Sequence, residues 1–166
     1  MSFCKKRAGT LFLSVLLLAA VACTPDEEPP PGYETLDGSR IDFSRLLGKV
    51  VLINYWAEWC TPCRQEIPAL NALQEEFSGQ VVVLGVNFDG VTGDELREQA
   101  DKMGITFAQL TQDPRAVFDA TPSGVLPETL VIDRRGKFQQ VLLGPQSVRS
   151  LRHVVASLPE EMAVGE

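Results

Sequence analysis

The chain has 166 residues, of which 45% are hydrophobic, enough for one globular domain with a packed core. Its four cysteines are too few for a disulfide-dense scaffold. The formal net charge is −7 and no basic stripe is present to neutralise phosphates, which argues against a nucleic-acid partner.

Residues 1–22 have the pattern of a secretory signal peptide. The basic run KKR at 5–7 precedes the apolar run TLFLSVLLLAAVA, which is short for a membrane-spanning helix. The small residues before Cys23 (AAVAC) resemble the cleavage box of bacterial lipoproteins, although Ala20 stands where leucine is more usual. This resemblance implies that Cys23 becomes the lipidated first residue. An uncleaved N-terminal anchor is the alternative, and either arrangement predicts a domain outside the cytoplasm, tethered to a membrane.

The stretch TPDEEPPPG at 24–32 is Pro-rich and acidic and cannot build a core. We therefore expect the lipidated cysteine and a linker at 23–32. A globular domain is expected at 33–160, followed by a short C-terminal tail at 161–166.

Within the predicted domain, apolar runs bounded by turn residues alternate with stretches of helical periodicity. Asp37-Gly38 predicts a hairpin turn, and the run KVVLINYWA predicts a strand buried on both faces of a sheet. This alternation predicts an α/β layer architecture. The predicted elements are a hairpin at 33–43, strands at 49–57, 80–88, 128–133 and 138–144, helices at 61–77, 92–104 and 147–158, and a helical turn at 114–120.

The pair of cysteines in WCTPC is the main chemical feature of the domain. Because Cys4 would leave with the signal and Cys23 would take the lipid, Cys60 and Cys63 are the thiols left in the mature chain. A closed zinc site needs further thiolate or imidazole ligands. The only histidine, His153, sits in the pattern LRHVV, which favours a surface or packing position. A structural disulfide across so short a loop would restrict the unfolded chain very little.

The placement of the pair favours redox chemistry. Cys60 follows a predicted strand and begins a predicted helix, where unpaired N–H groups and the helix dipole favour a thiolate, the attacking species in disulfide exchange. Cys63 shares that helix face and can resolve a mixed disulfide. Thr61 lies between them, and Pro62 suits a first helical turn because its missing N–H would be unpaired there.

The segment WAEWCTPC, with KVVLINY before it, resembles the active site of thioredoxins, and GVLPETLVID resembles their cis-proline segment. The likeness covers residues 36–158. The leader, the segment between VVVLGVNF and LPET, and the phrase PETLVID resemble the membrane-anchored TlpA/ResA/CcmG group. This resemblance implies a thioredoxin fold, a central mixed β-sheet flanked by helices, with an N-terminal β-hairpin and a central βα insertion.

The same resemblance implies a thiol–disulfide oxidoreductase that faces the periplasm. Such proteins commonly reduce protein disulfides, including those of apocytochrome c, and receive electrons from a membrane thiol relay of the DsbD or CcdA type. The resemblance implies the redox-active disulfide Cys60–Cys63 with no cofactor and no metal, and we expect a monomer. A cis Pro127 would lie beside the cysteines and leave the backbone of Leu126 to pair with a substrate strand. An ordinary turn proline is the alternative. Trp56 is expected to pack inside, and Trp59 to shield the site.

Two acidic positions depart from the thioredoxin pattern. Cytoplasmic thioredoxins carry a buried Asp six residues before the first cysteine, where this chain has Asn54. Glu66 matches an acidic residue of the ResA-type proteins, and a buried carboxylate with a raised pKa there could take and return the proton of Cys63. A helix-surface glutamate is the alternative. Glu58 is expected to be an exposed loop residue.

We therefore predict a membrane-tethered protein-disulfide reductase acting on disulfide-containing periplasmic proteins. A disulfide-donating oxidase of the same fold is the alternative within this chemistry, because sequence does not fix how far the Cys60 thiolate is stabilised. A copper(I) metallochaperone is the alternative from another class, since soft thiolates suit that ion.

Overall fold

A computed structural model describes residues 32–159 of the chain. The predicted signal peptide (1–22), the lipidation site Cys23, nearly all of the linker 23–32 and the tail 161–166 lie outside these residues. None of the helices in the described part is both long and apolar enough to cross a membrane.

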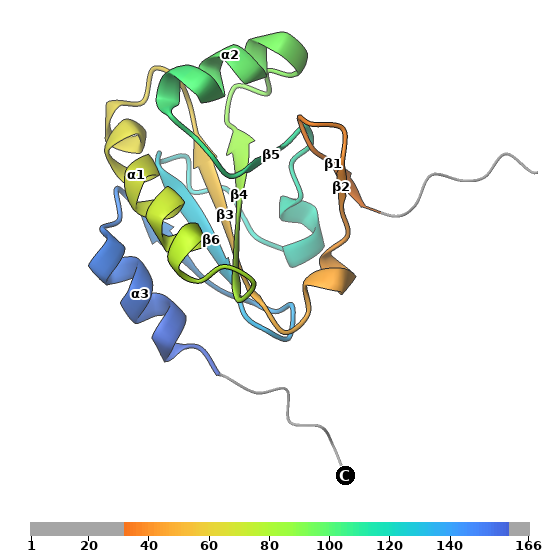
Figure 1. Cartoon of the computed structure of the whole chain (residues 1–166), viewed down its shortest axis with the longest axis vertical. Helices are drawn as coiled ribbons and strands as arrows, with labels where there is room; N and C mark the ends of the chain where they lie inside the picture. The colour runs from red at the N-terminus through yellow and green to blue at the C-terminus, as the bar shows by residue number, and fades with distance from the viewer. Residues whose placement is uncertain (1–31, 160–166) are drawn as a thin grey trace, which may run out of the picture. The chain divides into compact units, whose positions relative to one another are not determined.

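A mixed five-stranded sheet forms the centre of the domain, in the order β5-β4-β3-β6-β7 (Figure 1). The central strand β3 runs parallel to β4, which is parallel to β5, whereas β6 is antiparallel to both β3 and β7. Every residue of β3 is buried, as its continuous apolar run predicts. The strands are β3 (Val50–Trp56), β4 (Val81–Asn87), β5 (Ala108–Leu110), β6 (Glu128–Ile132) and β7 (Phe138–Leu143).

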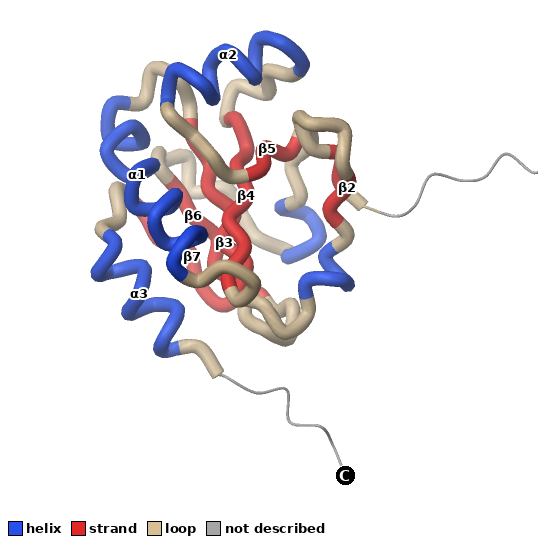
Figure 2. The backbone as a smooth tube through the Cα atoms, in the orientation of Figure 1, coloured by secondary structure: helices blue, strands red, loops and turns tan. Residues whose placement is uncertain are grey.

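Three α-helices pack around the sheet. Figures 1 and 2 show α1 (Thr61–Glu76) and α3 (Val148–Ser157) side by side on one face, and α2 (Gly93–Met103) follows β4. Gly104 ends α2 in the left-handed conformation (φ 71°), which glycine adopts without steric cost. Two short 3₁₀ helices, η1 (Phe43–Leu46) and η2 (Arg115–Phe118), also lie within the described residues. The mixed sheet and its helices confirm the predicted fold class.

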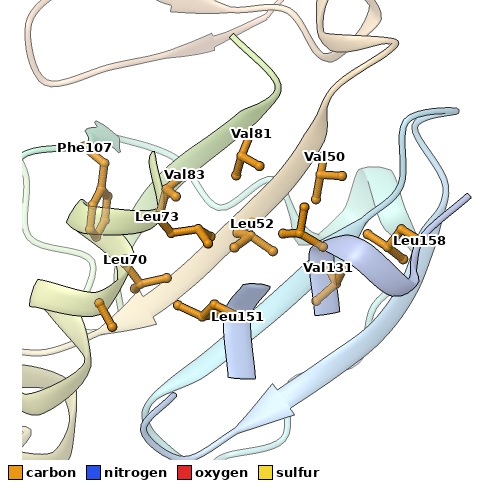
Figure 3. Close-up of a cluster of buried hydrophobic side chains, with 12 residues drawn as sticks. Val50, Leu52, Leu70, Leu73, Val81, Val83, Phe107, Val131, Leu151 and Leu158 are labelled. Carbon is orange, nitrogen blue, oxygen red and sulfur yellow. The ribbon is translucent and has the colours of Figure 1, made fainter. Parts of the chain in front are cut away.

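Alternation along β3 divides the core between the two faces of the sheet. Val50 and Leu52 point toward α1 and α3, where they pack with Leu70, Leu73 and Leu151 (Figure 3). The intervening residues of β3 point to the opposite face and pack against η2, η1 and the N-terminal hairpin. Because side chains alternate along a strand, each position of β3 and β6 is assigned to one face by its place in the sequence.

The N-terminal hairpin pairs β1 (Tyr33–Glu34) with β2 (Arg40–Ile41) in antiparallel fashion, as the Asp37-Gly38 turn predicts. It lies against β5, where Leu36 N–H donates to Gln109 O (2.8 Å) and Thr111 N–H donates to Glu34 O (2.9 Å). The residue pattern did not predict β5, because a three-residue strand is too short for a clear alternation. The resemblance implied a central βα insertion, and α2 and β5 lie between β4 and β6 along the chain. The other predicted strands and helices are present, with ends shifted by one or two residues.

Candidate active site

Cys60 and Cys63 form a disulfide at the start of α1. Cys60 is the N-cap of the helix, and its sulfur accepts a hydrogen bond from the backbone N–H of Cys63 (3.1 Å). Both residues are buried, with 3% and 1% of their surface exposed. A backbone donor and a helix N-terminus directed at one sulfur favour its ionised form once the disulfide is opened. The arrangement can therefore generate an attacking thiolate at Cys60 and hold the second sulfur in reach.

A cavity of about 450 Å³ opens beside Cys60, and Leu126 also lines it. The cavity is mostly apolar, so it fits a hydrophobic segment rather than a polar small molecule. Its lining residues are Trp59, Cys60, Thr61, Pro62, Phe88, Gly124 and Leu126.

The two tryptophans of the active-site turn are placed differently, as predicted. Trp56 is fully buried, and its indole N–H donates to the side-chain oxygen of Gln109 (2.8 Å). Trp59 is 64% exposed at the cavity, with its ring edge-on to Phe88 (centroids 6.4 Å apart). The Trp59 indole also donates to the Asp89 carboxylate (2.9 Å), so this exposed ring is held in one orientation.

The peptide bond between Leu126 and Pro127 is cis, as the resemblance to the thioredoxin cis-proline segment implies. Pro127 is buried, whereas Leu126 is half-buried and reaches the cavity that contains Cys60. The β3–β6 ladder begins at Glu128, so the backbone of Leu126 lies beyond it. Leu126 thus stands at the mouth of the site, next to a residue that cannot donate a backbone hydrogen bond.

A buried ion pair anchors the loop that carries this cis peptide. Glu128, the residue after Pro127, accepts hydrogen bonds from Arg115 at both carboxylate oxygens and from the Ser123 hydroxyl (2.9 Å). Arg115 also lies over the ring of Tyr55, 4.0 Å from its centroid. These contacts lie on the face of the sheet opposite α1 and connect η2, the loop and β6.

Glu66 is buried, with 1% of its surface exposed, so the alternative of a helix-surface glutamate is wrong. One carboxylate oxygen, Oε2, accepts from Asn54 Nδ2 (2.9 Å), and the other, Oε1, accepts from the backbone N–H of Gln146 (3.2 Å). Burial raises the pKa of Glu66 to about 7, although both hydrogen bonds act to lower it. Three residues after Cys63 on α1, this carboxyl can exchange a proton near neutral pH.

Two other residues considered from the sequence, one acidic and one imidazole, lie apart from Glu66 and its hydrogen-bond partners. Glu58 is partly exposed and pairs with Lys102 (3.4 Å), and His153 is exposed on α3. Within residues 32–159 no group of three or more His, Cys, Asp or Glu side chains is arranged to hold a metal ion.

Several residues of the site were not predicted. Phe88 follows β4 and Gly124 precedes the cis peptide, and both line the cavity. Phe88 carried a usable signal, because the carboxyl ends of neighbouring parallel strands meet at one edge of a sheet. Gln146 and Thr129 surround the Glu66 cluster through contacts that no local pattern indicates.

Comparison with known proteins places the chain among thioredoxin-like redox proteins. The profile of the AhpC/TSA family matches residues 24–141. The chain is 32% identical to the thioredoxin-like protein YneN of Bacillus subtilis over 127 residues, which cover 75% of this chain and 74% of YneN. It is 30% identical to the thiol-disulfide oxidoreductase ResA of Geobacillus thermodenitrificans over 124 residues, 74% of this chain and 71% of ResA. The crystal structure of a DsbF homologue from Corynebacterium diphtheriae superposes with a TM-score of 0.65 at 27% identity, covering 76% of this chain and 82% of that one.

Proposed function

Because this chain belongs to the AhpC/TSA family of thioredoxin-like proteins, we propose that its Cys60–Cys63 pair reduces disulfides of proteins outside the cytoplasm. The chain is a thiol–disulfide oxidoreductase of the ResA type. The observation that carries the redox chemistry is the N-cap position of Cys60, whose sulfur faces a backbone donor and lines an apolar cavity. The reducing direction is supported by the likeness to ResA.

The reaction needs two thiols and one proton carrier. The Cys60 thiolate attacks a substrate disulfide, forming a mixed disulfide and releasing one substrate thiolate, which takes a proton from solvent. Cys63 then gives its proton to Glu66 and attacks the Cys60 sulfur. The second substrate thiolate leaves and takes up the proton from Glu66. Two electrons and two protons pass to the substrate, and Cys60 and Cys63 become the disulfide.

The cavity predicts the kind of substrate segment that binds. Trp59, Phe88 and Val125 are large apolar side chains at least half exposed around the site. A substrate cysteine in an extended segment with apolar neighbours would cover them, while its backbone pairs with Leu126 by strand addition. Thr61 and Pro62 are exposed between the cysteines and would contact the same segment.

The cellular setting is part of the proposal. The leader sequence supports a lipid anchor at Cys23 and a periplasmic domain, and the resemblance to the TlpA/ResA/CcmG group supports a DsbD- or CcdA-like electron donor. Apocytochrome c is a candidate substrate on the same ground. The protein acts as a monomer in this scheme.

One observation favours the opposite direction of transfer. The Cys63 N–H and the helix N-terminus stabilise the Cys60 thiolate. Stabilising the reduced form of the pair makes its disulfide a stronger oxidant. A disulfide-donating oxidase is therefore the second candidate.

The reduction potential decides between the two. The full chain is purified in detergent with Cys4 and Cys23 replaced by serine and equilibrated with glutathione or dithiothreitol. A midpoint near or below about −270 mV supports a reductase, and one near about −120 mV supports an oxidase. The absence of a redox transition would overturn both, and the metal content after anaerobic purification would then test copper(I) binding.

A trapping experiment checks the order of attack. In the Cys63→Ser chain, Cys60 should retain substrate proteins as mixed disulfides that reductant releases. The Cys60→Ser chain is the matched control and should retain far less. Equal trapping by both variants would contradict the assignment of Cys60 as the attacking thiol.

A further inference from the structure

The side-chain amide of Asn54 is buried, and only one of its two polar groups forms hydrogen bonds. Its Nδ2 donates to Glu66 Oε2 and to Thr129 Oγ1, both at 2.9 Å. Its Oδ1 is buried with no hydrogen-bond partner among the described residues. Buried polar atoms are almost always paired, and an unpaired carbonyl oxygen beside a titrating carboxyl needs a reason.

We propose that Asn54 is the positioning residue of Glu66 and that its amide reverses when Glu66 takes up the proton of Cys63. The proposal rests on the function proposed above for Glu66. It adds a residue of β3, the strand that precedes the cysteines along the chain. Asn54 acts through Glu66 and contacts no substrate.

The geometry allows the reversal without a net loss of hydrogen bonds. A half-turn of the Asn54 amide places Oδ1 where Nδ2 now lies, next to Glu66 Oε2 and Thr129 Oγ1. A protonated carboxyl and a hydroxyl can both donate to that oxygen, whereas a carboxylate can only accept. The amide therefore makes two hydrogen bonds in either orientation, with Oδ1 unpaired in one and Nδ2 in the other. The proton on Glu66 selects between the two orientations.

Gln146 determines which carboxyl oxygen takes the proton. Its backbone N–H points at Glu66 Oε1 and can only donate, so Oε1 remains an acceptor in both states. The proton consequently belongs on Oε2, the oxygen that faces Asn54. Each protonation state of the buried carboxyl is then fully bonded, which lets Glu66 take and return a proton close to neutrality.

Few other ionisable groups stand near this cluster in the described part of the chain. Cys63 is on the same helix as Glu66, and β3 and β6 contribute the neutral Asn54 and Thr129. The charged and titratable side chains of α3 lie at exposed positions: Arg149, Arg152 and His153. The burial of Glu66 and its hydrogen bonds with Asn54 and Gln146 set its pKa.

NMR of the oxidised full chain in detergent micelles tests the proposal. The carboxyl carbon of Glu66 gives its titration, and contacts between the Asn54 amide protons and the Thr129 side chain give the orientation of the amide. We expect those contacts at high pH and their loss at low pH, with the same midpoint as the carboxyl. Asn54→Leu should raise that midpoint by about one unit, because the hydrogen bond lost from the carboxylate is charge-assisted and stronger than the one lost from the protonated carboxyl.

Asn87→Leu is the matched control, since it removes a buried amide of the neighbouring strand that bonds Gln99 instead, and it should leave the midpoint unchanged. If Glu66 titrates near neutrality while the Asn54 contacts persist at low pH, the reversal is overturned and the role of Glu66 stands. An unchanged midpoint in Asn54→Leu would overturn the positioning role. If Glu66 does not titrate near neutrality, its proposed role as proton carrier fails first. The wild-type contacts alone decide the reversal should Asn54→Leu not fold.

Discussion

Arg115 bonds both carboxylate oxygens of Glu128 inside the protein, with Nη1 2.8 Å from Oε1 and Nη2 3.3 Å from Oε2. Arg115 belongs to η2, and Glu128 begins β6 directly after the cis Pro127. The same guanidinium donates to the backbone oxygen of Thr121 (3.3 Å), inside the loop that lines the active-site cavity. The shape of that loop therefore depends on a pair of charges on the far face of the sheet.

Arg115→Met should lower the free energy of unfolding by about 3–5 kcal/mol, because it leaves the Glu128 carboxylate buried without its cation. Urea unfolding at neutral pH measures the change. Arg152→Met is the matched control: its partner Glu76 is an exposed carboxylate, and we expect a loss below about 1 kcal/mol. Equal losses in the two variants would contradict the importance of the buried pair.

Glu66 should make the fold less stable as pH rises. Its pKa lies at about 7 in the folded protein, against a usual value of 4.5, so the folded state holds a proton that the unfolded state has lost between these values. Stability should decline from about pH 4.5 to about pH 7 by roughly 3 kcal/mol and then level off. Urea unfolding of the oxidised protein across this range should show the slope, and Glu66→Gln should remove most of it. If the free energy of unfolding changes with pH in the same way in the wild-type protein and in Glu66→Gln, the pKa of Glu66 is not raised.

Gly85→Ala should displace Gln109 and, through it, Trp56. A Cβ at position 85 would collide with the side-chain amide of Gln109, whose oxygen accepts from the Trp56 indole. We expect a loss of about 1–3 kcal/mol from overpacking, together with a changed near-ultraviolet circular dichroism signal. Adding Gln109→Ala should relieve the collision but leave the buried indole N–H unpaired. A variant with wild-type stability and spectrum would show that the contact is easily accommodated.

Phe88→Ala should lower kcat/KM for a protein disulfide by about tenfold, because the ring lines the cavity and supports Trp59. Its rate of reduction by dithiothreitol should change much less, since that small reagent does not need the apolar surface. Val117→Ala provides the control, as Val117 is also about half exposed but lies on η2, away from the cavity lining. If Phe88→Ala slows both reactions equally, its effect is on the cysteines rather than on substrate binding.

The parts of the fold that depend on local patterns were predictable from the sequence. The apolar run of β3 and the turn residues around it are strong signals, and so is WCTPC at the start of a helix. Glu66 carried a signal too: it stands three residues after Cys63 and four before Leu70, on the buried stripe of α1. Its burial could not be separated from the exposure of Glu75 and Glu76 by residue type alone, because it depends on how closely α1 packs on β3.

Sequence patterns could not predict the contacts between segments that are far apart in the chain. Glu128 lies on one face of the sheet and its neighbour Thr129 on the other, so consecutive residues of β6 serve two separate clusters. Nothing in the sequence near Arg115 indicates that it reaches Glu128 rather than solvent. Such pairings depend on the register between strands and on the path of the loop.

The N-terminal hairpin protects the outer edge of β5 from pairing with another chain. Backbone hydrogen bonds at Glu34, Leu36, Gln109 and Thr111 occupy the outer side of β5. A chain shortened to begin after Asp42 would keep the cysteines and the cavity but expose a bare strand edge, which is a template for self-association. Any shortened version used for solution work must therefore begin ahead of Tyr33, even though the hairpin contributes no residue to the redox cavity.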